Sequence, residues 1–413
     1  MKKKILSAIS LVIAILTVLS CFSGCSELIN GDHTEDSSSL SDKISDIIEE
    51  TEKETQKPKK TTAKKTETTP VPGKTTTKVN LVDKEYDLSQ KNQAFKLVGR
   101  AKYTSTGIMF DHCAVALEFQ GYMTGDLKLT ASSAGNDGRT YYTVFVDGKR
   151  LEKRFLIDGI DQTITLATFT GKYFHTVRII KQTEPSNSDS RLKKLTMTGY
   201  LTKAPENQKY YIEYYGDSLT AGYGNIGKPG YSNAGSSEWQ DATKSYAFLA
   251  SEALKADCSI LAMSGVGVDK GWAPHPFMYY FSKYSYCRGD EAFSFEGARV
   301  PDLVVIHLGA NDITKGSTRE NFVKKGKELI NYIYNGYGKK MPIIWAYDPS
   351  EQVPDSWRQE VLDAFGGEAK GLYSLKLEWR SIGAGAGGHP SAAAHEKHAE
   401  LLVDLVKKKN LLK

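Results

Sequence analysis

Two hydrophobic patterns divide the chain after residue 79. From residue 80 to 203, apolar residues recur in short runs between turn residues, as in Tyr141–Val146, which Asp147 and Gly148 follow. β-Branched and aromatic residues at this spacing predict β-strands, and Asp-Gly predicts a hairpin turn. Similar runs occupy residues 114–119, 127–130, 163–166, 175–180 and 195–200. We therefore expect an all-β sandwich of the jelly-roll type over residues 80–203.

From residue 204 to 413 the pattern changes to strands that alternate with helices. The predicted strands cover residues 211–215, 259–263, 303–308 and 343–347, and the predicted helices cover 243–254, 322–334 and 392–408. Such alternation indicates an α/β fold, a parallel sheet with helices on both faces. Functional residues of such sheets lie at the carboxyl ends of the strands.

The first 25 residues have the pattern of a secretory signal. Lys2–Lys4 are followed by the uncharged apolar run Ile5–Leu19. Phe22–Cys25 then resembles the lipobox of bacterial lipoproteins, in which the cysteine is acylated and becomes the new N-terminus. We expect residues 1–25 to be a lipoprotein signal peptide with lipidation at Cys25. Cys21 is a second candidate, and a cleaved signal with incidental cysteines is the alternative.

Residues 26–79 are rich in Thr, Lys, Glu, Ser and Pro. This segment has too little apolar surface to offset the entropy of ordering, so we expect a disordered tether. With a lipid at Cys25, the protein would be secreted and anchored to the outer face of the bacterial cell membrane.

The remaining composition narrows the chemistry. Only Cys113, Cys258 and Cys287 would remain after processing, and they form neither a disulfide framework nor a metal-ligand motif. The formal net charge of +5 over 413 residues gives no case for nucleic-acid binding. We expect no metal and no cofactor.

Three motifs end predicted strands of the second domain. Ser218, in Gly-Asp-Ser-Leu, follows the first strand, where a sharp turn would present its hydroxyl as a nucleophile. Gly265 follows the second strand and Asn311 the third. The backbone N–H groups of Ser218 and Gly265 and the side-chain amide of Asn311 would form an oxyanion hole. Taken singly, Gly265 could also mark a plain turn and Asn311 a helix cap.

His389 stands just before the last predicted helix, in Gly-His-Pro-Ser, and is the expected general base. We expect His395 and His398, on the helix itself, to face solvent. Tyr223, Trp239, Trp272 and Trp345 are candidates for a platform that stacks on sugar rings, with core packing as the alternative for each.

Ser218, Gly265, Asn311 and His389 resemble the SGNH (GDSL) hydrolase family in residue type and order. A preceding β-sandwich, and Asp241…Ser245-Tyr246-Ala247 leading into Ala256-Asp257, resemble carbohydrate esterase family 2 over about residues 85–410. The resemblance implies an SGNH-type three-layer domain behind a sandwich, in a two-domain deacetylase of plant cell-wall polysaccharides.

The sequence departs from the wider family at one position. Most SGNH enzymes carry Asp three residues before the histidine, where this chain has Ala386, and no carboxylate lies between Glu378 and His389. A backbone carbonyl orienting His389 would give a Ser–His dyad, as the family 2 resemblance also implies. Lost activity, or a carboxylate from Asp348 or Glu378, are the alternatives.

These observations predict a cell-surface serine esterase that removes O-acetyl groups from xylan- or glucomannan-type polysaccharides through an acetyl-enzyme. A lipid or thioester hydrolase of the same superfamily is one alternative. A surface carbohydrate-binding lipoprotein with a degenerate site is another.

Overall fold

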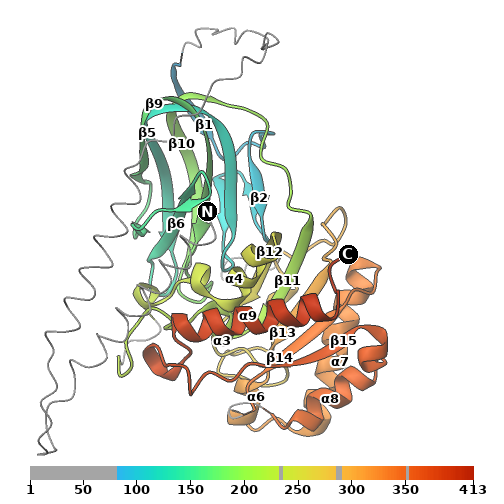
Figure 1. Cartoon of the computed structure of the whole chain (residues 1–413). Coiled ribbons are helices and arrows are strands. Elements are labelled where there is room, and N and C mark those ends of the chain that lie inside the picture. Colours follow the sequence, from blue (N-terminus) through green and yellow to red (C-terminus); the bar gives the residue numbers. More distant parts are fainter. Residues whose placement is uncertain (1–80, 232–235, 285–290, 350–352) are drawn as a thin grey trace, which may run out of the picture. The chain divides into compact units, whose positions relative to one another are not determined.

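The computed structural model describes residues 81–231, 236–284, 291–349 and 353–413 (Figure 1). The expected signal peptide, Cys25 and the tether lie outside these residues, as does Cys287. The described residues belong to one compact unit, 77–413. Among them, no helix is long and apolar enough to cross a membrane.

The N-terminal part is all-β and antiparallel, as the sequence predicts. Its strands form one continuous ten-stranded network around their own core. They are β1 (Asp83–Asp87), β2 (Lys96–Val98), β3 (Lys102–Thr104), β4 (Gly107–Phe110), β5 (Ala116–Ala134), β6 (Thr140–Val146), β7 (Lys149–Arg150), β8 (Phe155–Ile157), β9 (Gln162–Lys181) and β10 (Asp189–Leu201). The Asp147-Gly148 hairpin is confirmed, because Val146 pairs with Lys149 across it.

Several expected short strands merge into longer ones. The runs at 114–119 and 127–130 both contribute to β5, and those at 163–166 and 175–180 both lie in β9. Register shifts interrupt the β5–β9 ladder without ending it. These interruptions weaken the alternation of the pattern, so the sequence shows two short strands where the backbone continues.

The C-terminal part contains a five-stranded sheet in the order β12-β11-β13-β14-β15, in which every pair is parallel. Its strands are β11 (Tyr210–Gly216), β12 (Ala256–Ala262), β13 (Leu303–His307), β14 (Ile343–Tyr347) and β15 (Leu372–Lys376). The predicted parallel sheet is confirmed.

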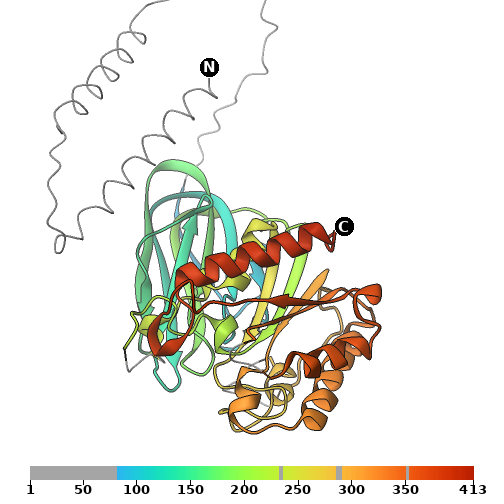
Figure 2. The same cartoon turned by 60° about the horizontal axis from the view of Figure 1, so that its bottom comes forward.

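Helices cover both faces of this sheet (Figures 1 and 2). Tyr214 and Val305 pack on one face with α4 and α9, whereas Tyr215 and Val304 pack on the other with α5, α7 and α8. This alternation gives the expected three layers. The helices are α3 (Ser218–Ala221), α4 (Tyr246–Ala253), α5 (Phe277–Phe281), α6 (Ala310–Thr314), α7 (Arg319–Tyr337), α8 (Asp355–Asp363) and α9 (Ala392–Lys408), with 3₁₀ turns η1 (Ser237–Trp239), η2 (Ala242–Lys244), η3 (Gly367–Lys370) and η4 (Ala386–Gly388).

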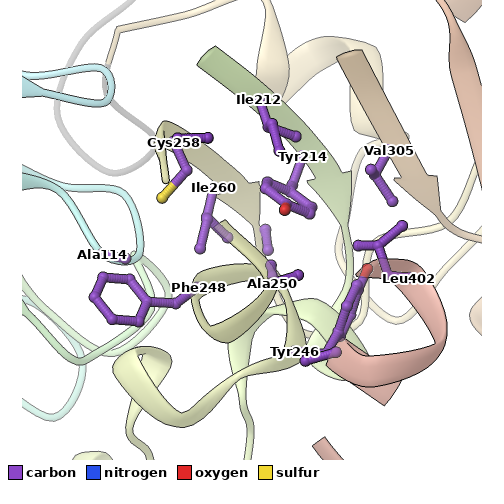
Figure 3. Close-up of a cluster of buried hydrophobic side chains, with 14 of the residues drawn as sticks. Ala114, Ile212, Tyr214, Tyr246, Phe248, Ala250, Cys258, Ile260, Val305 and Leu402 are labelled. Carbon is purple, nitrogen blue, oxygen red and sulfur yellow. The ribbon is translucent and has the colours of Figure 1, made fainter. Parts of the chain in front are cut away.

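The two domains share one hydrophobic cluster. Ala114 and Ile180 of the sandwich belong to the same buried cluster as Ile212 and Ile260 of the parallel sheet, and Figure 3 shows part of it. Cys113 also forms an antiparallel bridge with Ile260 of edge strand β12. The sandwich therefore packs directly against an edge of the hydrolase sheet, and burial of apolar surface holds the domains together.

A buried ionic cluster adds to this interface. Lys96 Nζ of β2 lies 2.7 Å from Asp257 of β12 and 3.2 Å from Glu118 of β5. Arg299 also donates to Asp257, at 2.7 Å. The paired charges satisfy one another where water is largely excluded.

Two histidines of α9 correct an expectation. His395 and His398 do not face solvent but are buried, at 0% and 1% exposure, where they surround the ring of Tyr246 with His307. Burial is the main cause that lowers the pKa of all three, and that of His395 falls to about 3. These histidines therefore stay neutral in the folded protein at neutral pH.

This burial predicts acid-sensitive stability. The pKa of His395 is lower in the folded than in the unfolded chain, so the unfolded chain binds more protons and stability is lost as pH falls below about 6.5. As the pH falls from 6.5 to 4.5, the loss from His395 alone should steepen towards about 1.4 kcal/mol per pH unit. Urea unfolding across this range measures it. His395→Gln should flatten the slope of the unfolding free energy against pH, whereas His275→Gln, at an exposed histidine, should not. Equal slopes in the unmodified chain and both variants would contradict the assignment.

Candidate active site

Ser218 follows the carboxyl end of β11, which lies between β12 and β13 in the sheet. It is the first residue of α3, and Asp217 caps this helix by accepting from the amide of Leu219 at 2.9 Å. Gly216 is required just before it, since a Cβ there would lie 2.1 Å from Thr220 Oγ1. The sharp strand-to-helix turn leaves Ser218 8% exposed at the bottom of a pocket.

His389 lies beside Ser218, although 171 positions separate them in the sequence. Its Nε2 is 2.9 Å from Ser218 Oγ, and its Nδ1 is 2.9 Å from the carbonyl oxygen of Gly387. A carbonyl oxygen only accepts, so Nδ1 carries the proton and Nε2 is left to accept from the serine hydroxyl. This is the tautomer that a general base for Ser218 needs.

Burial lowers the pKa of His389, and the hydrogen bond to Gly387 partly opposes it by raising the pKa. The free base therefore predominates at neutral pH. The tilted ring of Tyr223, whose centroid is 4.5 Å from that of His389, supplies part of this environment.

The two carboxylates considered for His389 have other neighbours. Glu378 pairs with Lys376 at 2.9 Å, and the charge of Asp348 acts on His398, whose pKa it raises slightly against the effect of burial. The Gly387 carbonyl occupies the position at Nδ1 where a third triad member would stand.

The expected oxyanion donors come from the two strands that flank β11. Asn311, in α6 after β13, lines the pocket over Ser218, and its amide nitrogen donates to the carbonyl of Val266 at 2.9 Å. That bond fixes the plane of the amide, and its second hydrogen faces Asp217 over a longer distance of 3.3 Å. Gly265 follows β12 in a turn with φ +81°.

The pocket above Ser218 has a volume of about 470 Å³. Trp272 forms part of its wall with its side chain 68% exposed, and Lys315 Nζ stands 3.2 Å from its ring centroid. Trp272 thus has the exposure that stacking on a ligand requires. The lining residues are Ser218, Leu219, Trp272, Ala310, Asn311, Ile313, Thr314, Arg380, Gly388 and His389.

The other three platform candidates are not among the residues that line this pocket. Trp345 is wrong as a candidate, because it is fully buried among the side chains that cover one face of the sheet. Its indole N–H donates to the Leu308 carbonyl at 3.1 Å. Trp239 is half-buried and packs on Tyr231, and Tyr223 packs on His389.

Several lining residues carried no signal in the sequence. Ile313, Thr314 and Arg380 reach the pocket through loops and short helices whose placement depends on the tertiary fold. Within the described ranges, no group of three His, Cys, Asp or Glu side chains is arranged to hold a metal ion.

Comparison with known domain families agrees with this geometry. Residues 212–350 match the family GDSL-like Lipase/Acylhydrolase, and residues 97–205 match Carbohydrate esterase 2 N-terminal. Residues 212–350 therefore belong to a hydrolase domain of the SGNH (GDSL) class. With the esterase 2 N-terminal domain in front of the hydrolase domain, the chain has the two-domain organisation of carbohydrate esterase family 2.

Individual relatives match the chain over much of its length. The chain is 27% identical to the cellulase/esterase CelE of Acetivibrio thermocellus over 71% of its own length, but spans only 36% of that protein. It is 25% identical to an acetylxylan esterase / glucomannan deacetylase of Cellvibrio japonicus, over 57% of this chain and 66% of that one. A family two carbohydrate esterase from Clostridium thermocellum, solved with cellohexaose, shares the fold at 24% identity, with a TM-score of 0.69 over 76% of this chain and 99% of that one.

The geometry of His389 predicts how Ser218 reacts with a fluorophosphonate probe. Labelling requires the neutral imidazole, so its rate should fall as the pH drops through the pKa of His389, with a midpoint below 6.5. Mass spectrometry of labelled protein against time and pH gives the rate.

Carboxylate variants test the role of the Gly387 carbonyl. His389→Ala should slow labelling by at least about a thousandfold, whereas Glu378→Gln and Asp348→Asn should stay within about threefold of the unmodified chain. A loss in either carboxylate variant as large as that of His389→Ala would indicate a triad.

Proposed function

We propose that this chain is a serine esterase that removes O-acetyl groups from polysaccharides of the xylan or glucomannan type. The observation that carries the proposal is the pair of 2.9 Å contacts at His389, one to Ser218 Oγ and one to the Gly387 carbonyl. Together they form a Ser–His dyad in the protonation state that nucleophilic attack requires.

In the first step, Ser218 Oγ attacks the acetyl carbonyl carbon while His389 Nε2 takes the hydroxyl proton. The carbonyl oxygen becomes an oxyanion, which the N–H groups of Ser218 and Gly265 and the side-chain amide of Asn311 stabilise. Asn311 would exchange its longer contact, of 3.3 Å to Asp217, for the oxyanion and keep its bond to Val266. When the tetrahedral intermediate collapses, the C–O bond to the sugar breaks. The imidazolium returns its proton to the leaving sugar oxygen, and an acetyl-enzyme remains.

In the second step, His389 takes a proton from water, and the hydroxyl attacks the acetyl-enzyme. The second intermediate collapses with cleavage of the bond to Ser218 Oγ, which regains a proton from His389. The products are acetate and the free serine, and the reaction consumes one water. A neutral carbonyl stabilises the imidazolium less than a carboxylate would, but it fixes the same tautomer.

The substrate class is supported by the N-terminal family match and by the names of the relatives, an acetylxylan esterase / glucomannan deacetylase among them. The exposed ring of Trp272 beside Ser218 offers a stacking surface for a sugar next to the acetylated one. The burial of Ser218 and Leu219 at the pocket floor favours a small ester group such as acetyl.

We also propose that the protein acts at the cell surface, anchored through a lipid at Cys25. The support is in the sequence: the apolar run Ile5–Leu19, the lipobox-like Phe22–Cys25 and the polar segment 26–79. Such an anchor would keep the enzyme beside polymers that are too large to enter the cell.

Acetate release tests the activity directly. The purified chain should release acetate from acetylated xylan and acetylated glucomannan, and Ser218→Ala should lower kcat by at least about a thousandfold without loss of fold. Enzymatic acetate measurement gives the rate, and circular dichroism gives the fold. Polymer binding without acetate release would favour the carbohydrate-binding alternative, and release of only long acyl chains would favour a lipid hydrolase.

Trp272→Ala tests the stacking surface. Loss of the ring should raise KM for an acetylated polymer about three- to tenfold, because stacking contributes about 0.5–1.5 kcal/mol. The kcat for p-nitrophenyl acetate, which has no neighbouring sugar, should change less than about twofold. Tyr173→Ala is a matched control, since Tyr173 is 64% exposed but is not among the residues lining the pocket. An equal effect on both substrates would contradict a role in polymer binding.

A further inference from the structure

A carboxylate of the sandwich reaches into the hydrolase domain beside the oxyanion turn. Glu184 lies in the loop between β9 and β10 and is fully buried. Its Oε2 accepts from the backbone amide of Ser264 at 2.6 Å, and its Oε1 accepts from the Ser264 hydroxyl at 2.8 Å. Oε1 also accepts from Gln240 Nε2 at 2.8 Å. All three donors belong to the hydrolase domain.

The loop that carries Glu184 is itself held firmly. Lys181 is fully buried at the end of β9, and its ammonium donates to the carbonyls of Thr183 at 2.6 Å and Asp111 at 2.9 Å. The Glu184 amide donates to Gln240 Oε1 at 3.3 Å. Glu184 is thus fixed through its backbone as well as its side chain, as a support for another group must be.

Ser264 is the residue directly before Gly265, so the peptide between them carries the Gly265 N–H. Glu184 holds Ser264 by its amide and its hydroxyl at once, which restricts rotation on the N-terminal side of that peptide. On the other side, the Gly265 carbonyl accepts from Ala273 at 2.9 Å. The turn is therefore held at both ends, and its N–H has a set direction before any substrate arrives.

A chain of hydrogen bonds connects the segment of Gln240 with the segment that follows His389. The next residue, Asp241, exchanges two hydrogen bonds with the side chain of Asn225, at 2.9 and 3.0 Å. The Asn225 carbonyl accepts from Ala392 at the start of α9, at 2.8 Å. One carboxylate therefore contacts the oxyanion turn directly and the segment that supports the histidine loop indirectly.

From this geometry we infer that Glu184 is a positioning residue for the oxyanion turn and that the sandwich is a required part of the esterase site. The inference rests on the proposed function, because the turn matters only if an oxyanion forms at Ser218. The electrostatic effect of Glu184 would oppose this role, since a negative charge near the turn disfavours an oxyanion. The two effects predict changes of opposite sign in kcat when the charge of Glu184 is removed.

Glu184→Gln separates these effects. The side chain keeps its shape, but one acceptor oxygen is replaced by a donor NH₂ group. Because three donors face the Glu184 carboxylate, the substitution sets a donor against a donor. If positioning dominates, kcat for p-nitrophenyl acetate should fall about 10- to 100-fold with KM within about twofold, as for partial loss of an oxyanion donor. The double variant Glu184→Gln/Gln240→Glu restores a donor–acceptor pair and should recover at least about a third of the kcat.

Asp257→Asn is the matched control for a merely structural effect. It weakens the buried pair with Lys96 in the same interface, away from the oxyanion turn, so it should lower stability but leave kcat within about twofold. If Glu184→Gln does not fold, Ser264→Ala removes only the partly exposed hydroxyl and should lower kcat severalfold.

An unchanged or increased kcat in Glu184→Gln, or in Ser264→Ala where the former does not fold, would overturn the inference and leave the proposed function intact. A loss of kcat in Asp257→Asn equal to that in the turn variant would overturn it as well. Absence of esterase activity in the unmodified chain would instead overturn the proposed function, and the inference with it.

Discussion

The candidate site depends on one constraint, that parallel strands end at the same edge of their sheet. In the order β12-β11-β13, the central strand leads to Ser218 and its two neighbours lead to Gly265 and Asn311. Three groups distant in the sequence are thus brought to the same edge of the sheet. His389 comes from outside this sheet, and hydrogen bonds from Ala386 to Gly224 and from Ala392 to Asn225 hold its loop against the turn after Ser218.

The sandwich contacts the edge strand β12 and the turn that follows it. The apolar cluster that it shares with β12 fixes this strand, and Ser264 follows the end of the strand. Glu184 of the sandwich accepts two hydrogen bonds from Ser264 itself. A carboxylate can lie fully buried there because three donors satisfy it. The same contact would be costly on an independently moving domain, since separation would expose the apolar cluster and leave the donors unpaired. Apolar packing and hydrogen bonding therefore reinforce each other at this interface.

The hydrophobic period was sufficient for the fold, and the positions of the motifs were sufficient for placing Ser218 at the carboxyl edge of the sheet and His389 just before the last helix. What they missed depends on which face is buried. His395, His398 and Leu402 recur at helical spacing on one side of α9, and that spacing is a signal of burial that the polar character of histidine obscures. Trp345 and Ala346 are neighbours in β14 and point to opposite faces of the sheet, and both are buried because helices cover both faces. The hydrophobic pattern of such a strand therefore does not distinguish a buried indole from an exposed one. Glu184 has no local signal, because its three donors lie 56 and 80 positions away.

The glycine-rich run before His389 gains a physical reason from the structure. Gly387 and Gly388 have φ values of +63° and +68°, a backbone conformation that residues with a side chain rarely adopt. This conformation turns the Gly387 carbonyl back towards Nδ1 of His389, where a side-chain carboxylate would otherwise stand. A carbonyl carries no charge, so it raises the pKa of the buried His389 imidazole less than a carboxylate would, and the lowering by burial is offset less. Ala386 is therefore no sign of a lost triad by itself, since the backbone that follows it supplies the acceptor that the side chain lacks.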